Sequence, residues 1–184
     1  MSCRRDNGVK TRPAVTDMVF TAVFAALIAV CSILSIPVGE VPVTLQTFGV
    51  CLAAAMLGWK RGTLSVLVYV LLGAVGLPVF SGMSGGAGVL AGPTGGYIIG
   101  FIPAALIIGF AADRWQRRAL PLAAAMVLGV LVCYALGTVW FMLLTHRGAV
   151  ESLALCTVPF LIPDAVKIAA AAVLSNRLSK VVEL

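Results

Sequence analysis

The sequence is poor in charged side chains. Asp, Glu, Lys and Arg make up 11% of its 184 residues, whereas hydrophobic residues make up 61%. A soluble domain of this size needs far more polar surface, so the composition excludes a soluble globular protein and predicts an all-α integral membrane protein. A membrane-spanning helix takes about 20 apolar residues, so the chain has room for about six such helices joined by short loops.

The sequence also lacks the motifs of common enzymes and nucleotide-binding proteins. It has one histidine, His146, and it has no Ser/His dyad, no paired carboxylates and no Walker motif. Its five cysteines have no metal-ligand spacing. We therefore expect no catalytic site, no metal and no cofactor, and we expect a partner to supply the energy for moving any bound molecule.

The apolar runs predict a single membrane domain at residues 17–184, after a cytoplasmic N-terminal tail at residues 1–16. The first run is too long for the apolar part of a signal peptide and is interpreted as a retained first helix. The six predicted spans are residues 17–36, 43–58, 62–76, 97–112, 120–145 and 153–176.

The basic residues are unevenly distributed among the predicted loops. All 13 Lys and Arg residues except Arg147 and Lys167 fall in the two terminal segments, the second-to-third connection or the fourth-to-fifth connection. With six spans, these segments share one side of the membrane, and the positive-inside rule makes that side cytoplasmic. Both termini are therefore expected in the cytoplasm, and the net charge of +6 reflects topology rather than nucleic-acid binding. Trp59 and Trp115, at cytoplasmic span ends, are expected to anchor the protein at the membrane interface.

Asp164 and Lys167 lie within the last predicted span, although a charge at the bilayer centre costs roughly 2.5–3.5 kcal/mol. Residues three apart on a helix share a face. The pair predicts a polar ligand held inside an apolar bundle; the alternative is a structural ion pair with Lys167 reaching outwards. Asp164 precedes Arg177 by about 20 Å of helix, which favours a pocket open to the outside. Pro163 favours a helix start that places Asp164 in the first turn.

The loop at residues 77–96 is uncharged and has eight glycines when Gly76 at its edge is included. Backbone outside a helix is tolerated at membrane depth where it lines a cavity, and glycine permits such conformations. We expect this loop to border the ligand pocket; the alternative is a flexible lid.

The first predicted span carries two overlapping pairs of small residues, Ala22 with Ala26 and Ala25 with Ala29. Small residues four apart let another membrane helix approach closely. The pairs therefore predict a surface for a partner protein.

Four segments together resemble the BioY family: residues 42–47, 76–101, 134–140 and 159–167. BioY proteins are the biotin-binding S components of energy-coupling factor (ECF) transporters. The resemblance implies a six-helix S-component bundle in the cell membrane that captures biotin near its outer face. It also implies three partners, a membrane-embedded T component and two cytoplasmic ATPase subunits, contacted through the alanine pairs of the first span.

The resemblance further implies a set of ligand-binding residues. Asp164 and Lys167 match the Asp-x-x-Lys of the family, and we expect Asp164 to accept from a ureido N–H and Lys167 to donate to the ureido oxygen. The next candidates for the pocket are Gln46, Ser84, Gly86 and Tyr97. The alternative functions are an S component for another vitamin, an intramembrane enzyme that uses Asp164 and Lys167, and a small self-sufficient homo-oligomeric transporter.

Overall fold

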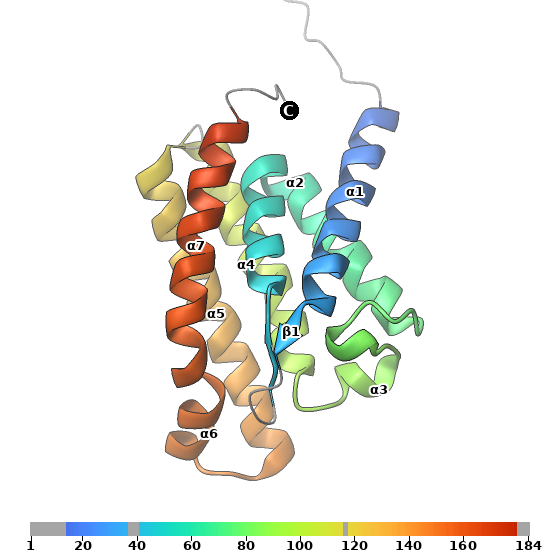
Figure 1. Ribbon diagram of the computed structural model, residues 1–184, viewed down its shortest axis with the longest axis vertical. Coiled ribbons are helices and arrows are strands. Elements are labelled where there is room, and N and C mark those ends of the chain that lie inside the picture. Colours follow the sequence, from blue (N-terminus) through green and yellow to red (C-terminus); the bar gives the residue numbers. More distant parts are fainter. Residues whose placement is uncertain (1–13, 37–40, 116–117, 180–184) are drawn as a thin grey trace, which may run out of the picture.

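The apolar runs form a bundle of helices in the computed structural model, which describes residues 14–36, 41–115 and 118–179. The described chain begins and ends at the same end of this bundle (Figure 1). Within these described ranges, five helices are long and apolar enough to cross a membrane: α1 (Ala14–Ile33), α2 (Gln46–Ala74), α4 (Gly95–Arg114), α5 (Ala119–Thr145) and α7 (Val158–Leu178). The short elements are β1 (Ser35–Ile36), β2 (Val43–Thr44), η1 (Ser81–Met83), α3 (Ala87–Leu90) and α6 (Ala149–Cys156).

Most helix ends agree closely with the predicted spans. α4 and α5 match residues 97–112 and 120–145 to within two residues. α1 is shifted three residues towards the N-terminus, because residues 35–36 pair with β2 instead of continuing the helix. Residues 1–13 of the predicted tail lie outside the described residues.

The second and third predicted spans form one element, α2, which reverses direction at Gly58. This glycine has φ 77° and ψ −176°, a conformation that side-chain-bearing residues rarely adopt. A Cβ on Gly62 would lie 2.7 Å from the Cα of Ala54, so the parts before and after the reversal pack side by side. Figure 1 shows the first part rising to the end where α1 begins and the second part descending from it.

A carboxylate from the end of α4 stabilises this reversal. The backbone N–H of Trp59 donates to Oδ2 of Asp113 at 3.0 Å, which satisfies one amide at the start of the second part of α2. The reversal is therefore held to α4 by a defined hydrogen bond.

The prediction of one helix across residues 153–176 is wrong at its beginning. Residues 149–156 form the separate helix α6, and the backbone breaks at Thr157 before α7 begins at Val158. Pro163 lies inside α7, so the prediction that the helix starts there is also wrong. Pro159 occupies the first turn instead, where a missing backbone N–H removes no helical hydrogen bond.

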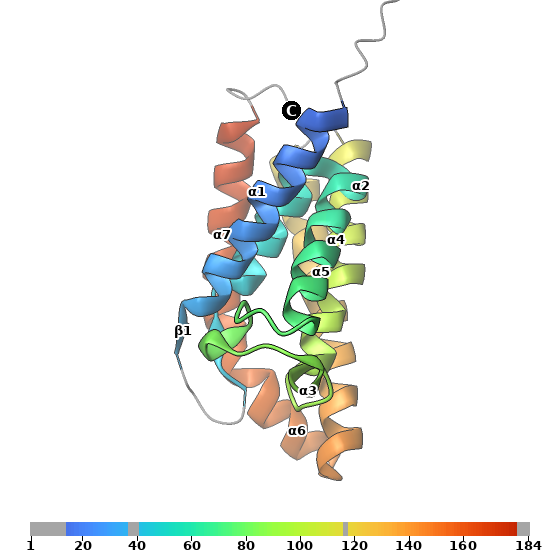
Figure 2. The ribbon, with the colours of Figure 1, turned by 90° about the vertical axis from the view of Figure 1, so that its right-hand side faces the viewer.

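The connections at the other end of the bundle gather into a cap (Figure 2). β1 and β2 form a short antiparallel hairpin in which Ser35 pairs with Thr44. The segment with η1 and α3 crosses the same end, next to α1, α2 and α4. The glycine-rich loop is thus partly ordered into short helical turns.

α4 lies at the centre of the packing, between α2 and α5. Glycines allow α4 and α5 to approach closely: a Cβ on Gly100 would lie 3.2 Å from the Cα of Cys133, and one on Gly137 would collide with the ring of Tyr97. Close packing of small residues is how membrane helices associate.

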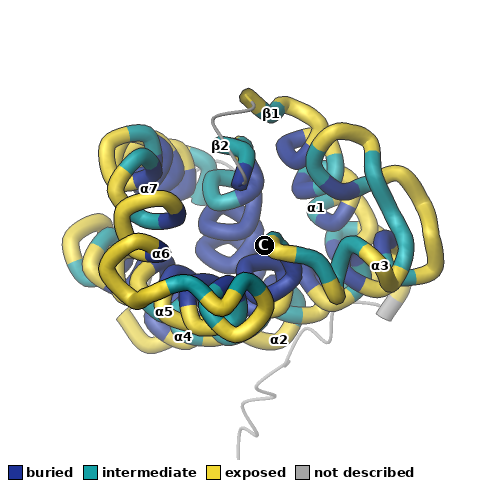
Figure 3. Tube along the Cα trace, turned by 90° about the horizontal axis from the view of Figure 1, so that it is seen from below, coloured by how far each residue is buried: buried dark blue, intermediate teal, exposed yellow. Residues whose placement is uncertain are grey.

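The outer faces of the helices are apolar. Met18, Leu143 and Ile162 are 70%, 70% and 79% exposed, and Figure 3 shows exposed residues around the outside with buried residues facing inwards. A surface of this kind is stable against lipid rather than water. The chain is therefore a multi-pass membrane protein.

Candidate functional site

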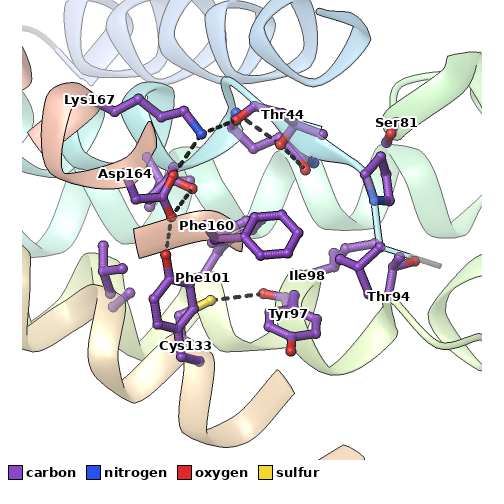
Figure 4. A pocket seen from close by; sticks show the side chains of 18 of the residues that line it. Thr44, Ser81, Thr94, Tyr97, Ile98, Phe101, Cys133, Phe160, Asp164 and Lys167 are labelled. Carbon is purple, nitrogen blue, oxygen red and sulfur yellow. Dashed lines mark hydrogen bonds and ion pairs between the residues drawn. The ribbon is translucent and has the colours of Figure 1, made fainter. Parts of the chain in front are cut away.

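An internal cavity of about 240 Å³ lies in the half of the bundle next to the cap. This volume is slightly below the roughly 300–1,000 Å³ of most small-molecule pockets, so it suits a compact ligand. Most of its wall is apolar, with a few hydroxyl, amide and charged groups (Figure 4). The lining residues are Val41, Pro42, Thr44, Gln46, Thr47, Val50, Cys51, Phe80, Ser81, Ser84, Val89, Thr94, Tyr97, Ile98, Phe101, Ala104, Ile108, Val130, Cys133, Tyr134, Cys156, Phe160, Asp164 and Lys167.

Asp164 and Lys167 face the cavity and each other. Nζ of Lys167 donates to Oδ1 of Asp164 at 2.6 Å, and the two residues are only 8% and 3% exposed. Lys167 does not reach outwards, because its Nζ also donates to the carbonyl oxygen of Thr44 on β2 at 2.6 Å. The hydrogen bond to Thr44 therefore ties α7 to the hairpin while Asp164 and Lys167 remain part of the cavity wall.

Asp164 has two further partners. The hydroxyl of Tyr134 on α5 donates to its Oδ2 at 2.5 Å, and the hydroxyl of Thr47 lies 3.4 Å from the same oxygen. A buried carboxylate needs such donors to offset its loss of hydration. Three elements thus converge on one side chain: α2, α5 and α7.

This network leaves some hydrogen-bonding capacity. An ammonium group has three donors, and Lys167 uses two of them on Asp164 and Thr44. A carboxylate has about four acceptor positions, and three described donors reach Asp164. The Tyr134 hydroxyl donates to Asp164, so its oxygen can still accept a hydrogen bond. The cluster can therefore offer one donor and two acceptors to a bound molecule.

Gln46 lines the cavity, but its amide is engaged with the protein. Its Oε1 accepts from the hydroxyl of Thr44 at 2.9 Å, and its Nε2 donates to the hydroxyl of Tyr69. Tyr69 in turn donates to Ser32 on α1 at 3.1 Å. Gln46 therefore holds Thr44 in place, and the carbonyl of Thr44 holds Lys167.

Tyr97 contributes its ring to the cavity wall rather than its hydroxyl. The hydroxyl lies 3.2 Å from that of Thr138 and 3.5 Å from the carbonyl oxygen of Cys156. Figure 4 shows this hydroxyl pointing away from Asp164 and Lys167. The residue binds α4 to α5 and α6 while presenting an aromatic face.

The two candidates from the glycine-rich loop differ. Ser84 lines the cavity, and its hydroxyl donates to the carbonyl oxygen of Ser81 at 2.7 Å. Gly86 is absent from the lining that the described residues form. It precedes α3 with φ 101°, and its N–H donates to the carbonyl oxygen of Gly73 at 2.7 Å. Gly86 therefore sets the path of the loop.

The aromatic part of the wall was not predicted from the sequence. Phe80, Phe101 and Phe160 line the cavity, and Phe80 is fully buried against the edge of Tyr69, with ring centroids 5.6 Å apart. The sequence does not show whether an aromatic residue in an apolar run faces lipid or a pocket, so these three residues could not be predicted as part of the wall. Tyr134 offered a signal, because its hydroxyl is a rare polar group in its span.

The two alanine pairs of α1 are in different environments. Ala22 and Ala26 are exposed on the outer face, whereas Ala25 is 2% exposed and Ala29 is half-buried against the core. Only the first pair is open to another helix.

Comparisons with known proteins agree with one another. The model of the BioY family matches residues 5–184. The protein named "Biotin transporter BioY" from Thermotoga maritima is 45% identical over 164 residues, covering 89% of this chain and 96% of that protein. The "Probable biotin transporter BioY" of Pyrococcus horikoshii is 43% identical, with 88% and 95% covered. A crystal structure of "the S-component for biotin from an ECF-type ABC transporter" superposes with a TM-score of 0.85 at 31% identity, covering 91% of this chain and 92% of that one.

Proposed function

This chain belongs to the BioY family, and we propose that it is the membrane subunit that captures biotin from outside the cell for an ECF-type transporter. The observation that carries the proposal is the buried cluster of Asp164, Lys167 and Tyr134, whose remaining hydrogen-bonding positions match a cyclic urea. The names of the relatives and of the similar structure support the same ligand.

The head of biotin is a urea with one carbonyl oxygen and two N–H groups. The third donor of Lys167 binds the carbonyl oxygen, and the remaining acceptor positions on Asp164 and Tyr134 take the two N–H groups. Hydrogen bonds to charged partners in a buried site are stronger than bonds between neutral groups, so this contact gives both affinity and orientation.

The rest of biotin is an apolar bicycle with a carboxylate tail. Phe80, Phe101 and Phe160 provide an apolar wall for the bicycle. The tail extends towards the hydroxyl groups of Ser81 and Thr94, which lie across the cavity from Lys167 in Figure 4. The site needs no cofactor.

The membrane topology follows from the same proposal. The two parts of α2 count as separate spans, which makes six, and both termini lie in the cytoplasm. The reversal at Gly58 and the connection between α4 and α5 are at the end of the bundle where the described chain begins and ends (Figure 1). Those segments carry the basic residues, so the cavity is in the outer half.

The chain is a transport subunit and not an enzyme. Its sequence has no nucleotide-binding motif. We propose that a membrane T component and two ATPase subunits drive transport, and that the exposed pair of Ala22 and Ala26 on α1 is the contact with the T component.

The direct test is biotin binding to the purified chain in detergent, measured by calorimetry, with riboflavin and thiamine as controls. Saturable one-to-one binding of biotin alone supports the proposal. Preferential binding of another vitamin would assign the chain a different ligand, and biotin uptake by proteoliposomes containing only this chain would show that it needs no partners.

A further inference from the structure

A second cavity of about 630 Å³ lies on the outer surface, at the end of the bundle where α4 leads into α5. No described residue lines both cavities. The described residues of its walls are all uncharged, and they come from the reversal in α2 and from the facing surfaces of α4 and α5. The residues that form this groove are Trp59, Leu106, Ile107, Phe110, Ala111, Trp115, Pro121, Ala124, Ala125 and Leu128.

The groove is elongated along the helices. On α4 it runs from Trp115 to Leu106, nine residues or about 14 Å, and on α5 from Pro121 to Leu128, about 10 Å. Trp59 and Trp115 lie at the end nearest the loops and are 43% and 47% exposed. Tryptophan prefers the boundary between hydrocarbon and lipid headgroups, so the groove extends from that boundary into the hydrocarbon region.

Three basic residues are close in the chain to the tryptophans at this end of the groove. Nζ of Lys60 lies 5.3 Å from the ring centroid of Trp59. Arg114 directly precedes Trp115, and the backbone N–H of Arg118 donates to the carbonyl oxygen of Trp115 at 3.1 Å. All three side chains are exposed, and no salt bridge between two described residues involves any of them.

One acidic residue lies near these cations, and it is already engaged. Oδ2 of Asp113 accepts the backbone N–H of Trp59. The described residues next to this end of the groove therefore include three basic residues and one carboxylate, and the described residues that line the groove have apolar side chains.

We propose that this groove binds an anionic phospholipid. One acyl chain occupies the groove between α4 and α5, and Lys60, Arg114 and Arg118 hold the headgroup phosphate. The apolar groove matches the acyl chain of a lipid, the tryptophans match the interface, and the basic residues match the phosphate. A partner helix would match the apolar groove but would not account for the basic residues next to its end.

Native mass spectrometry of the purified protein in detergent tests the proposal. Phosphatidylglycerol and phosphatidylcholine with identical acyl chains are added in equal amounts, and the lipid retained by each protein molecule is counted. We expect one phosphatidylglycerol to be retained in preference to phosphatidylcholine. Because a basic residue near the headgroups contributes about a factor of five in affinity, Lys60→Ala, Arg114→Ala and Arg118→Ala should each lower this preference about fivefold.

A second variant tests the groove itself. Ala124→Phe fills the groove from an exposed position on α5 and should reduce retention of both lipids. Ala135→Phe is the matched control, because Ala135 is exposed on the same helix outside the groove, and Arg177→Ala is the control for charge at the end of α7. Biotin binding by every variant verifies the fold independently of lipid.

The results separate the possible occupants. Equal retention of the two lipids by the wild type, or equal losses in the control variants, would overturn the proposal. If the wild type has the mass of a dimer and Ala124→Phe has the mass of a monomer, the groove binds a second copy of the protein. That result would also contradict the proposal.

Discussion

Lys167 is the residue on which the site depends most. Its ammonium group is buried between a carboxylate and a backbone carbonyl, and it has one donor left for a ligand. An alanine at this position would leave Asp164 as a buried carboxylate without its cation. Removing one partner of such a pair costs more than the bond itself, because the remaining charge stays buried.

We predict that Lys167→Ala and Asp164→Asn each weaken biotin binding at least tenfold. Loss of one partner in a desolvated polar contact costs about 1–3 kcal/mol, and more when charge is involved. Calorimetry on the purified variants measures the effect, with circular dichroism as the control for helix content. Wild-type affinity in both variants would rule out the assignment of these residues to the ligand.

Biotin methyl ester, which lacks the free carboxylate, shows which end of biotin Lys167 contacts. If Lys167 holds the ureido oxygen, Lys167→Ala should weaken binding of biotin and of its methyl ester by the same factor. If Lys167 instead holds the carboxylate, the ester should be insensitive to the substitution.

Two tyrosines provide a matched pair of substitutions. Tyr134→Phe removes a donor to Asp164 and an acceptor at the cavity, so we expect biotin affinity to fall about five- to tenfold. Tyr97→Phe removes a hydroxyl that bonds Thr138 and Cys156, so we expect a lower thermal unfolding midpoint with nearly unchanged affinity. The opposite ranking of the two affinities would place the ligand against the Tyr97 hydroxyl.

At the scale of the elements, the reversal inside α2 is the most demanding feature of the chain. Gly58 has a positive φ, and a Cβ there would lie 2.3 Å from Oδ1 of Asp113. A side chain would strain the backbone and displace the carboxylate that caps the second part of α2.

We therefore predict that Gly58→Ala destabilises the protein by about 1–3 kcal/mol and lowers its thermal unfolding midpoint in detergent by several degrees. Gly148→Ala is the matched control, because Gly148 has φ −65° and nothing within 4 Å of its Cβ position. Equal midpoints for the two variants would mean that the backbone at residue 58 adapts without cost.

The long helices could be predicted because an apolar run of about 20 residues rarely forms anything other than a membrane-spanning helix. The short elements could not: α6 and the β1–β2 hairpin are too brief to produce a periodic signal, and the second half of α6 was included in the last predicted span. Within the site, Asp164 and Lys167 could be predicted because a charged side chain in an apolar run has a high free-energy cost of burial in the membrane. Phe101 and Phe160 could not be distinguished in this way, because a phenylalanine in an apolar run has no such cost. Gly86 was predicted from a loop of which only some residues line the cavity.

At the scale of the whole molecule, the placement of basic residues sets the orientation in the membrane. Ala119, at the start of α5, and Ala149, at the start of α6, are both exposed and lie at opposite ends of the bundle (Figure 1). The proposed topology puts the first in the cytoplasm and the second outside.

We predict that Ala149→Cys reacts with a membrane-impermeant maleimide in intact cells, whereas Ala119→Cys reacts only after permeabilisation. Both variants are made in a background in which the five native cysteines are replaced by Ala or Ser. Labelling of both positions after permeabilisation is the control. The reverse pattern in intact cells would invert the orientation and place the biotin cavity in the inner half.

The second part of α2 faces lipid through Leu64, Leu67 and Leu71, and its sixteen residues, 59–74, rise only about 24 Å. The hydrocarbon core of a typical bilayer is about 30 Å thick. Because tilting would shorten the height of this helix further, the bilayer beside it must become thinner, at fractions of a kcal/mol per Å of mismatch. Membrane thickness thus acts as an external variable on this protein, and lengthening the acyl chains of its host bilayer will increase this local thinning even when every residue stays the same.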